Sequence, residues 1–160
     1  MKIIYLLIQF SLFSIYPAIG QTLSANVLSD VDTSKIYLFY LHGQITIENG
    51  KGKSQYFGIY EYQGILDTFS SYGYKVISEP RSMSVDEREY AGKVSRQIDT
   101  LLKAGVNPAK ISVVGASAGA YIAIDVALRV KNKNIKYAIL GMCWPDTYKS
   151  YQGKDLCGNF

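Results

Sequence analysis

A serine set among small residues is the part of this sequence best suited to chemistry: Gly115-Ala116-Ser117-Ala118-Gly119. The apolar run 111–114 precedes this segment and the apolar segment 120–130 follows it, as expected of a strand and a helix. An abrupt turn from strand to helix strains its central residue and needs small neighbours on both sides. The G-x-S-x-G pattern therefore predicts a nucleophile elbow, which exposes the Ser117 hydroxyl before a helix N-terminus. A tight turn without catalytic role is the alternative interpretation.

The elements that must position this serine alternate along the chain. Continuous or short apolar runs predict strands at 36–41, 74–78, 111–114 and 137–142. Helical spacing predicts helices at about 58–72, 84–104 and 120–130, and the polar loop 45–57 has the composition of a small hairpin. Ser84 and Glu87 form a capping box for the second helix. With right-handed crossovers, this order predicts an α/β fold, a parallel sheet with helices on both faces.

The strand that ends in His42-Gly43, the elbow at 115–119 and the alternating elements resemble the α/β-hydrolase superfamily over residues 36–142. The resemblance implies that Ser117 is the nucleophile, and that the backbone N–H groups of Ala118 and Gln44 form the oxyanion hole. A tetrahedral oxyanion needs two such preorganised donors. In the family the catalytic histidine follows the nucleophile, so we expect His42 to shape the oxyanion loop through hydrogen bonds to backbone rather than to act as a base.

The acid and base that a serine nucleophile needs are harder to assign, because no histidine follows Ser117. Asp146, just past the fourth predicted strand, is the candidate triad acid, and a simple turn residue after Pro145 is its alternative interpretation. Asp125 is a poorer candidate, because its position in the third helix predicts a pair with Arg129 at i, i+4.

Two explanations of the missing base stay open. The sequence is a fragment of a longer hydrolase whose base lies beyond Phe160, or it is a short natural form that folds without one. We favour the fragment, a partial α/β-hydrolase fold. It predicts an unpaired apolar sheet edge at 137–142, which complete proteins normally cover.

Residues 1–20 have the pattern of a secretory signal peptide. Lys2 precedes the mostly apolar segment 3–19, and Ala18-Ile19-Gly20 is a small-x-small cleavage site. A retained membrane anchor is the alternative, although polar residues and a proline interrupt the run. We expect a mature domain of residues 21–160 that is secreted or periplasmic, with no stable membrane span. A disulfide between Cys143 and Cys157 would fit that compartment and close a loop of about 15 residues. The alternative is that Cys143 is a buried thiol at the strand end and Cys157 is free or paired elsewhere.

Composition restricts the classes of partner. The 160 residues are 48% hydrophobic and 19% charged, which describes one globular domain, and the net charge of +4 is too small and scattered for nucleic-acid binding. His42 is the only histidine and no zinc-type spacing occurs, so no metal and no cofactor are expected.

The expected partner is a small-molecule ester or acyl substrate. A non-catalytic binding protein is the alternative function, with the 14 tyrosines and Trp144 presenting aromatic surface to a sugar or apolar ligand.

Overall fold

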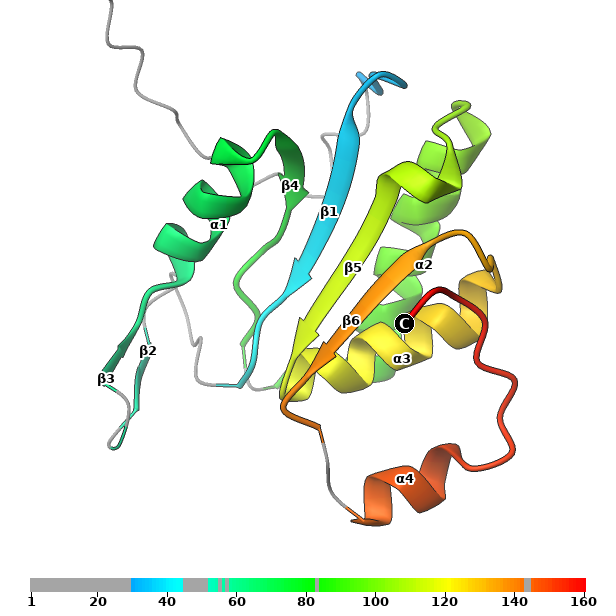
Figure 1. The fold of residues 1–160 in the computed structure, drawn as a ribbon. Helices are drawn as coiled ribbons and strands as arrows, with labels where there is room; N and C mark the ends of the chain where they lie inside the picture. The colour runs from blue at the N-terminus through cyan, green and yellow to red at the C-terminus, as the bar shows by residue number, and fades with distance from the viewer. Residues whose placement is uncertain (1–29, 45–51, 55, 57, 83, 143–144) are drawn as a thin grey trace, which may run out of the picture.

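The computed structural model describes residues 30–44, 52–54, 56, 58–82, 84–142 and 145–160. Its centre is a four-stranded sheet in the order β4-β1-β5-β6, in which every neighbouring pair is parallel (Figure 1). The strands are β1 (Ile36–Leu41), β4 (Tyr74–Ile77), β5 (Ile111–Ala116) and β6 (Lys136–Leu140). The predicted α/β class with a parallel sheet is confirmed, and all four predicted strands are present to within two residues at each end.

Helices cover both faces of this sheet. The helices α2 (Glu87–Lys103) and α3 (Ala118–Val130) lie together on one face, and α1 (Tyr62–Ser71) lies on the other (Figure 1). Alternate residues of β1 point to the two faces, because successive side chains of a strand do so. Tyr37 and Phe39 pack with α2 and α3, whereas Leu38 and Tyr40 pack with α1. All residues of β1 except the first are buried, as its continuous apolar sequence predicts.

The segment before α1 differs from the prediction. The short strands β2 (Gly52–Ser54) and β3 (Gly58–Tyr60) pair antiparallel as a hairpin, and α1 begins only at Tyr62. The predicted helix start near residue 58 is therefore too early, and the hairpin extends beyond the loop assigned to it. Tyr60 explains the difference, because its hydroxyl bonds to that of Tyr40 at the end of β1, which holds β3 against the sheet.

The start of α2 is a second correction. Asp86, not Ser84, is the N-cap: its carboxylate accepts a hydrogen bond of 2.8 Å from the N–H of Glu89. The Ser84 hydroxyl bonds instead to that of Ser82, at 2.8 Å. The predicted capping box of Ser84 with Glu87 is therefore wrong, because an equally good capping residue lies two positions closer to the first helical turn.

The last strand has a partly covered outer edge. Among the described residues Asn159 forms a parallel bridge with Lys136, and its carbonyl accepts the N–H of Tyr137 at 2.7 Å. The ring of Phe160 stacks on that of Tyr137, with centroids 5.2 Å apart. The predicted unpaired edge is thus closed at its beginning, while Leu140 at its end is 51% exposed. A short helix, α4 (Pro145–Tyr151), lies between β6 and this bridge.

Some predictions fall outside the described residues: the signal peptide at 1–20, Cys143 and Trp144. The disulfide between Cys143 and Cys157 therefore stays a prediction, and Cys157 is half-buried. In the part of the chain that the structure describes, no helix combines the length and apolar character that crossing a bilayer requires.

Candidate functional site

The candidate site lies where the two central strands end. Leu41 of β1 pairs with Gly115 of β5, so the residues that follow these two strands emerge side by side at one edge of the sheet. The chain leaves β1 toward β4 through α1 on one face, then returns through α2 on the other face to β5. The direction of winding changes between β1 and β5, and open α/β sheets bind ligands outside the carboxyl ends of strands at such a switch point.

Ser117 occupies the turn between β5 and α3 in a strained backbone conformation, with φ 51° and ψ −116°. This combination lies outside the usual regions of an L-residue and costs about 1–3 kcal/mol. The N–H of Ser117 donates a hydrogen bond of 2.8 Å to the carbonyl of Leu140 in β6, which holds the turn. The side chain is exposed, and no described residue hydrogen-bonds to its hydroxyl.

Two glycines make this turn possible. A Cβ at Gly119 would overlap the carbonyl oxygen of Leu41 and lie 2.8 Å from that of His42, so the helix backbone touches the end of β1. A Cβ at Gly115 would lie 2.8 Å from the Cα of Ala120. The requirement for small residues around Ser117 is therefore confirmed, and its reason is the close approach of α3 to the two central strands.

His42, immediately after β1, is 1% exposed, and within the described part of the chain its ring bonds only to backbone groups. Its Nε2 accepts a hydrogen bond of 2.8 Å from the N–H of Arg81, so Nδ1 carries the proton and donates to the carbonyl of Gly43 at 2.6 Å. The ring of Tyr62 from α1 packs edge-on against the imidazole, with centroids 5.5 Å apart. The expected shaping role of His42 agrees with this geometry.

The electrostatic environment keeps His42 neutral. Burial, partly offset by the bond to the Gly43 carbonyl, lowers the pKa of His42 to about 4. The nearby positive charge of Arg81 lowers this pKa further. Because the proton-accepting nitrogen is already bonded and buried, His42 is not placed to take a proton from Ser117.

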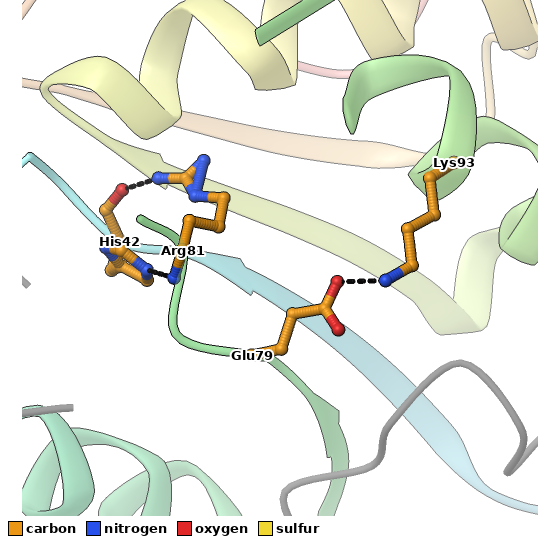
Figure 2. Close-up of polar contacts among 4 residues, drawn as sticks. All are labelled: His42, Glu79, Arg81 and Lys93. Atoms are coloured by element: carbon orange, nitrogen blue, oxygen red, sulfur yellow. Dashed lines mark hydrogen bonds and ion pairs between the residues drawn. The ribbon is translucent and has the colours of Figure 1, made fainter. Parts of the chain in front are cut away.

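Arg81 holds the segment after β1 in place (Figure 2). Its Nη2 donates a hydrogen bond to the His42 carbonyl, and its backbone N–H donates one to the imidazole. Arg81 therefore fixes both the backbone and the side chain of His42. The guanidinium also lies over the ring of Tyr90 in α2, 5.1 Å from its centroid. The adjacent Glu79 turns away and pairs with Lys93. Arg81 is 8% exposed, and burial lowers its pKa.

A small cavity of about 40 Å³ lies next to Ala118, the residue that follows Ser117. Ala118 and Gln44, the residues predicted to form the oxyanion hole, both line it, as does Gly43. The N–H of Ala118 belongs to the first turn of α3, where amides have no acceptor within the helix. The described residues that line it are His42, Gly43, Gln44, Arg81, Ser82, Val85, Glu87, Ala118 and Ile122.

The candidate acids lie on or beside the last helices. Asp146 is in the first turn of α4, where its side chain is almost fully exposed and lies 3.9 Å from Lys149. Asp125 accepts a hydrogen bond of 3.5 Å from the hydroxyl of Tyr151, while Arg129 donates to the carbonyl of Arg88 at 3.3 Å. The predicted pairing of Asp125 with Arg129 is therefore wrong, because each residue has a partner from another helix.

Sequence reasoning missed the contacts of Arg81 and Tyr62 with His42, a hydrogen bond to its Nε2 and an edge-on ring contact. Arg81 follows Pro80 just beyond the end of β4, the strand next to β1. A charged residue at the carboxyl end of a parallel strand was the available signal. In the described part of the chain, no group of three or more His, Cys, Asp or Glu residues is arranged to hold a metal ion.

Comparison with protein-family models, with curated proteins and with solved structures found no match to this chain. The mixed α/β class and its parallel sheet therefore rest on the structure itself, and a function must be argued from the site.

Proposed function

We propose that this chain carries the nucleophile of a secreted or periplasmic serine hydrolase of the α/β-hydrolase type, which acts on an ester or related acyl bond. Ser117 attacks the carbonyl carbon, and the N–H groups of Ala118 and Gln44 bind the oxyanion. The observation that carries this proposal is the backbone of Ser117: its positive φ belongs to an exposed residue directly before Ala118, which lines a cavity together with Gln44, the other predicted donor.

Several features of the site support this role. Strain at a single exposed residue persists only where the surrounding structure imposes it, and here contacts from β1, β6 and α3 all impose it. The same turn begins a 13-residue helix whose first residue, Ala118, lines the cavity, and the positive N-terminal end of a helix favours the negative charge that develops in acyl transfer.

The proposal requires a general base that the described residues do not supply. The only histidine, His42, is neutral and has both ring nitrogens bonded to backbone groups. Asp146 faces solvent. We therefore propose that the base, and the acid that orients it, come from a segment beyond Phe160, as the resemblance to the superfamily implies.

The test is covalent labelling of the full-length protein, isolated from its native source or expressed from its intact reading frame, with a serine-reactive fluorophosphonate. We expect labelling at Ser117, identified by peptide mass spectrometry, and its loss in Ser117→Ala. Ser71→Ala, which changes an exposed serine of α1, is the matched control and should label normally. Equal labelling of the Ser117→Ala variant would exclude Ser117 as the nucleophile.

A non-catalytic binding protein is the second candidate. The observation in its favour is that no described side chain hydrogen-bonds to the Ser117 hydroxyl. If the folded full-length protein is not labelled and hydrolyses no ester, the cavity next to Ala118 becomes a ligand site without chemistry.

A further inference from the structure

Lysines gather at the end of the sheet opposite the candidate site, where the four parallel strands begin (Figure 1). Four of them adjoin the strands: Lys35 directly precedes β1, Lys75 is the second residue of β4, Lys110 directly precedes β5, and Lys136 is the first residue of β6. The strands are parallel, so their first residues lie along one edge of the sheet. We call this edge, with the lysines around it, the basic edge.

Two helices bring three more lysines to the basic edge. Because α2 and α3 connect parallel strands, each ends near the start of the next strand. Lys103 is the last residue of α2, Lys131 is the C-cap of α3, and Lys133 lies in the turn into β6. Contacts join these segments, since Nζ of Lys110 donates hydrogen bonds of 3.2 and 3.1 Å to the carbonyls of residues 33 and 34. The fold thus gathers lysines that are spread over residues 35–136.

Acids do not balance this charge among the described residues. Asp30 and Asp32 precede β1, and Asp99 lies one turn before the end of α2, so seven lysines at the basic edge face three aspartates. The C-terminal ends of α2 and α3 offset only about one charge of this excess, because each helix end carries roughly half a negative charge. The molecule is therefore positive at one end, although its net charge is only +4.

Exposed apolar side chains accompany the lysines. Tyr72, the C-cap of α1, is 75% exposed, and Ile36, the first residue of β1, is 43% exposed. Both lie at the basic edge, because Ile36 pairs with Tyr74 at the start of β4. Cations beside exposed tyrosine and aliphatic side chains suit the boundary of a bilayer, where charged headgroups cover acyl chains. A nucleic acid binds basic surfaces mainly through its phosphates and gains little from an aliphatic side chain.

The chain also enters the described domain at the basic edge. Nζ of Lys75 donates a hydrogen bond of 3.1 Å to the carbonyl of Asp30, which places residue 30 beside the start of β4. The mostly apolar residues 3–19 precede this point in the sequence. A segment of that composition that contacts a membrane is therefore joined to the domain on its basic side.

We propose that the basic edge binds the surface of a lipid bilayer that carries anionic headgroups. Ser117 follows the carboxyl end of β5, at the other end of the sheet, so it then faces away from the bilayer toward the aqueous phase. Molecules dissolved in water beside the membrane, rather than lipids within it, reach the candidate site in this orientation. The proposal does not rest on the proposed function, because none of these lysines belongs to the candidate site.

Vesicle co-sedimentation tests the proposal with the full-length mature protein. The probes are vesicles of phosphatidylcholine alone and vesicles of phosphatidylcholine and phosphatidylglycerol in equal parts. We expect the protein to bind the anionic vesicles at least about 10-fold more tightly, and to lose affinity as NaCl is added, because salt screens exposed charges. Absence of binding, or equal binding to both kinds of vesicle, would overturn the proposal.

A matched pair of charge variants locates the surface. Lys133→Gln combined with Lys136→Gln removes two exposed lysines of the basic edge, and affinity for the anionic vesicles should fall by about 10-fold or more. Arg88→Gln combined with Lys149→Gln removes the same charge from exposed residues of α2 and α4, and should bind like the wild type. Circular dichroism confirms that both variants are folded. An equal loss of affinity in the two variants would refute a localised surface.

Tyr72→Ser separates a lipid surface from a soluble polyanion, for which heparin is the probe. This variant should bind the anionic vesicles about 3-fold or more weakly, because the tyrosine ring no longer contacts the bilayer boundary, and should bind heparin like the wild type. Unchanged vesicle binding would overturn the lipid assignment in favour of a soluble polyanion. These measurements need no turnover, so a failure of fluorophosphonate labelling at Ser117 would count against the proposed function alone.

Discussion

The backbone N–H of Arg81 donates a hydrogen bond of 2.8 Å to Nε2 of His42 across 39 positions of sequence. This bond joins the ends of β4 and β1 and decides the chemistry of the only histidine. With Nε2 occupied as an acceptor, the imidazole is a neutral structural group that donates from Nδ1 to the chain at Gly43. The segment that positions Gln44 is therefore held by a buried histidine that is not free to transfer protons.

The first prediction concerns the titration of His42. Because it is the only histidine, its imidazole gives a single set of NMR signals. Burial lowers the pKa of His42 from 6.5 to about 4, so these signals should not titrate between pH 8 and 5.5. A midpoint near 6.5 would contradict the buried geometry.

The same shift makes stability depend on pH. The unfolded chain takes up a proton below about pH 6.5, whereas folded His42 remains neutral until about pH 4. The contribution of His42 to stability is therefore complete above pH 6.5 and declines as pH falls toward 4, by roughly 3 kcal/mol in total. In urea unfolding across this range, the free energy of unfolding should fall more steeply with decreasing pH for the wild type than for His42→Gln. An equal pH dependence in the two proteins would count against the prediction.

The second prediction concerns the contact between α3 and β1. Gly119→Ala should destabilise the fold by about 3 kcal/mol, because the added methyl group meets the carbonyl oxygens of Leu41 and His42. Gly64→Ala in α1 is the control, since its Cβ meets only the Glu61 side chain, at 3.6 Å. That variant should gain about 0.5–1 kcal/mol from helix propensity. Urea denaturation measures both changes, and equal effects would contradict the close approach.

The third prediction concerns backbone strain at Ser117. Ser117→Gly should raise the free energy of unfolding by about 1 kcal/mol, because glycine adopts positive φ without a Cβ clash. Lys131 also has positive φ, at 49°, and Lys131→Gly should be stabilising by a similar amount. Ser117→Gly alone should lose fluorophosphonate labelling. Thermal unfolding measures both stabilities, and a less stable Ser117→Gly would argue against stored strain.

The fourth prediction tests the start of α2. Asp86→Ala removes the side chain that caps the N–H of Glu89 and should cost about 1 kcal/mol in stability. Ser84→Ala should change stability by less than about 0.5 kcal/mol, because its hydroxyl is exposed and bonds only to Ser82. If urea denaturation shows a larger loss of stability for Ser84→Ala than for Asp86→Ala, the capping box of Ser84 with Glu87 would be correct after all.

The sequence was most informative where the determinants are local. The apolar run at 36–41 is a buried strand as predicted, because a strand covered on both faces needs apolar residues throughout. The run predicted as a strand at 111–114 lies within β5, which extends two residues further to Ala116. The hairpin before α1 was harder, because its position depends on the bond between Tyr60 and Tyr40, far apart in sequence. The prediction of the α2 N-cap failed for a different reason. Ser84 and Asp86 are both good capping residues, they lie two positions apart, and the sequence alone does not choose between them.

The sequence by itself determined the order of the elements and the turn at Ser117, because hydrophobic periodicity and small residues act over a few neighbouring positions. Only the tertiary structure decided that Arg81 holds His42 and that Asp125 bonds to Tyr151. These two contacts join residues that are 39 and 26 positions apart. They follow from the strand order β4-β1-β5-β6 and from helix packing, which bring distant chain segments to one edge of the sheet.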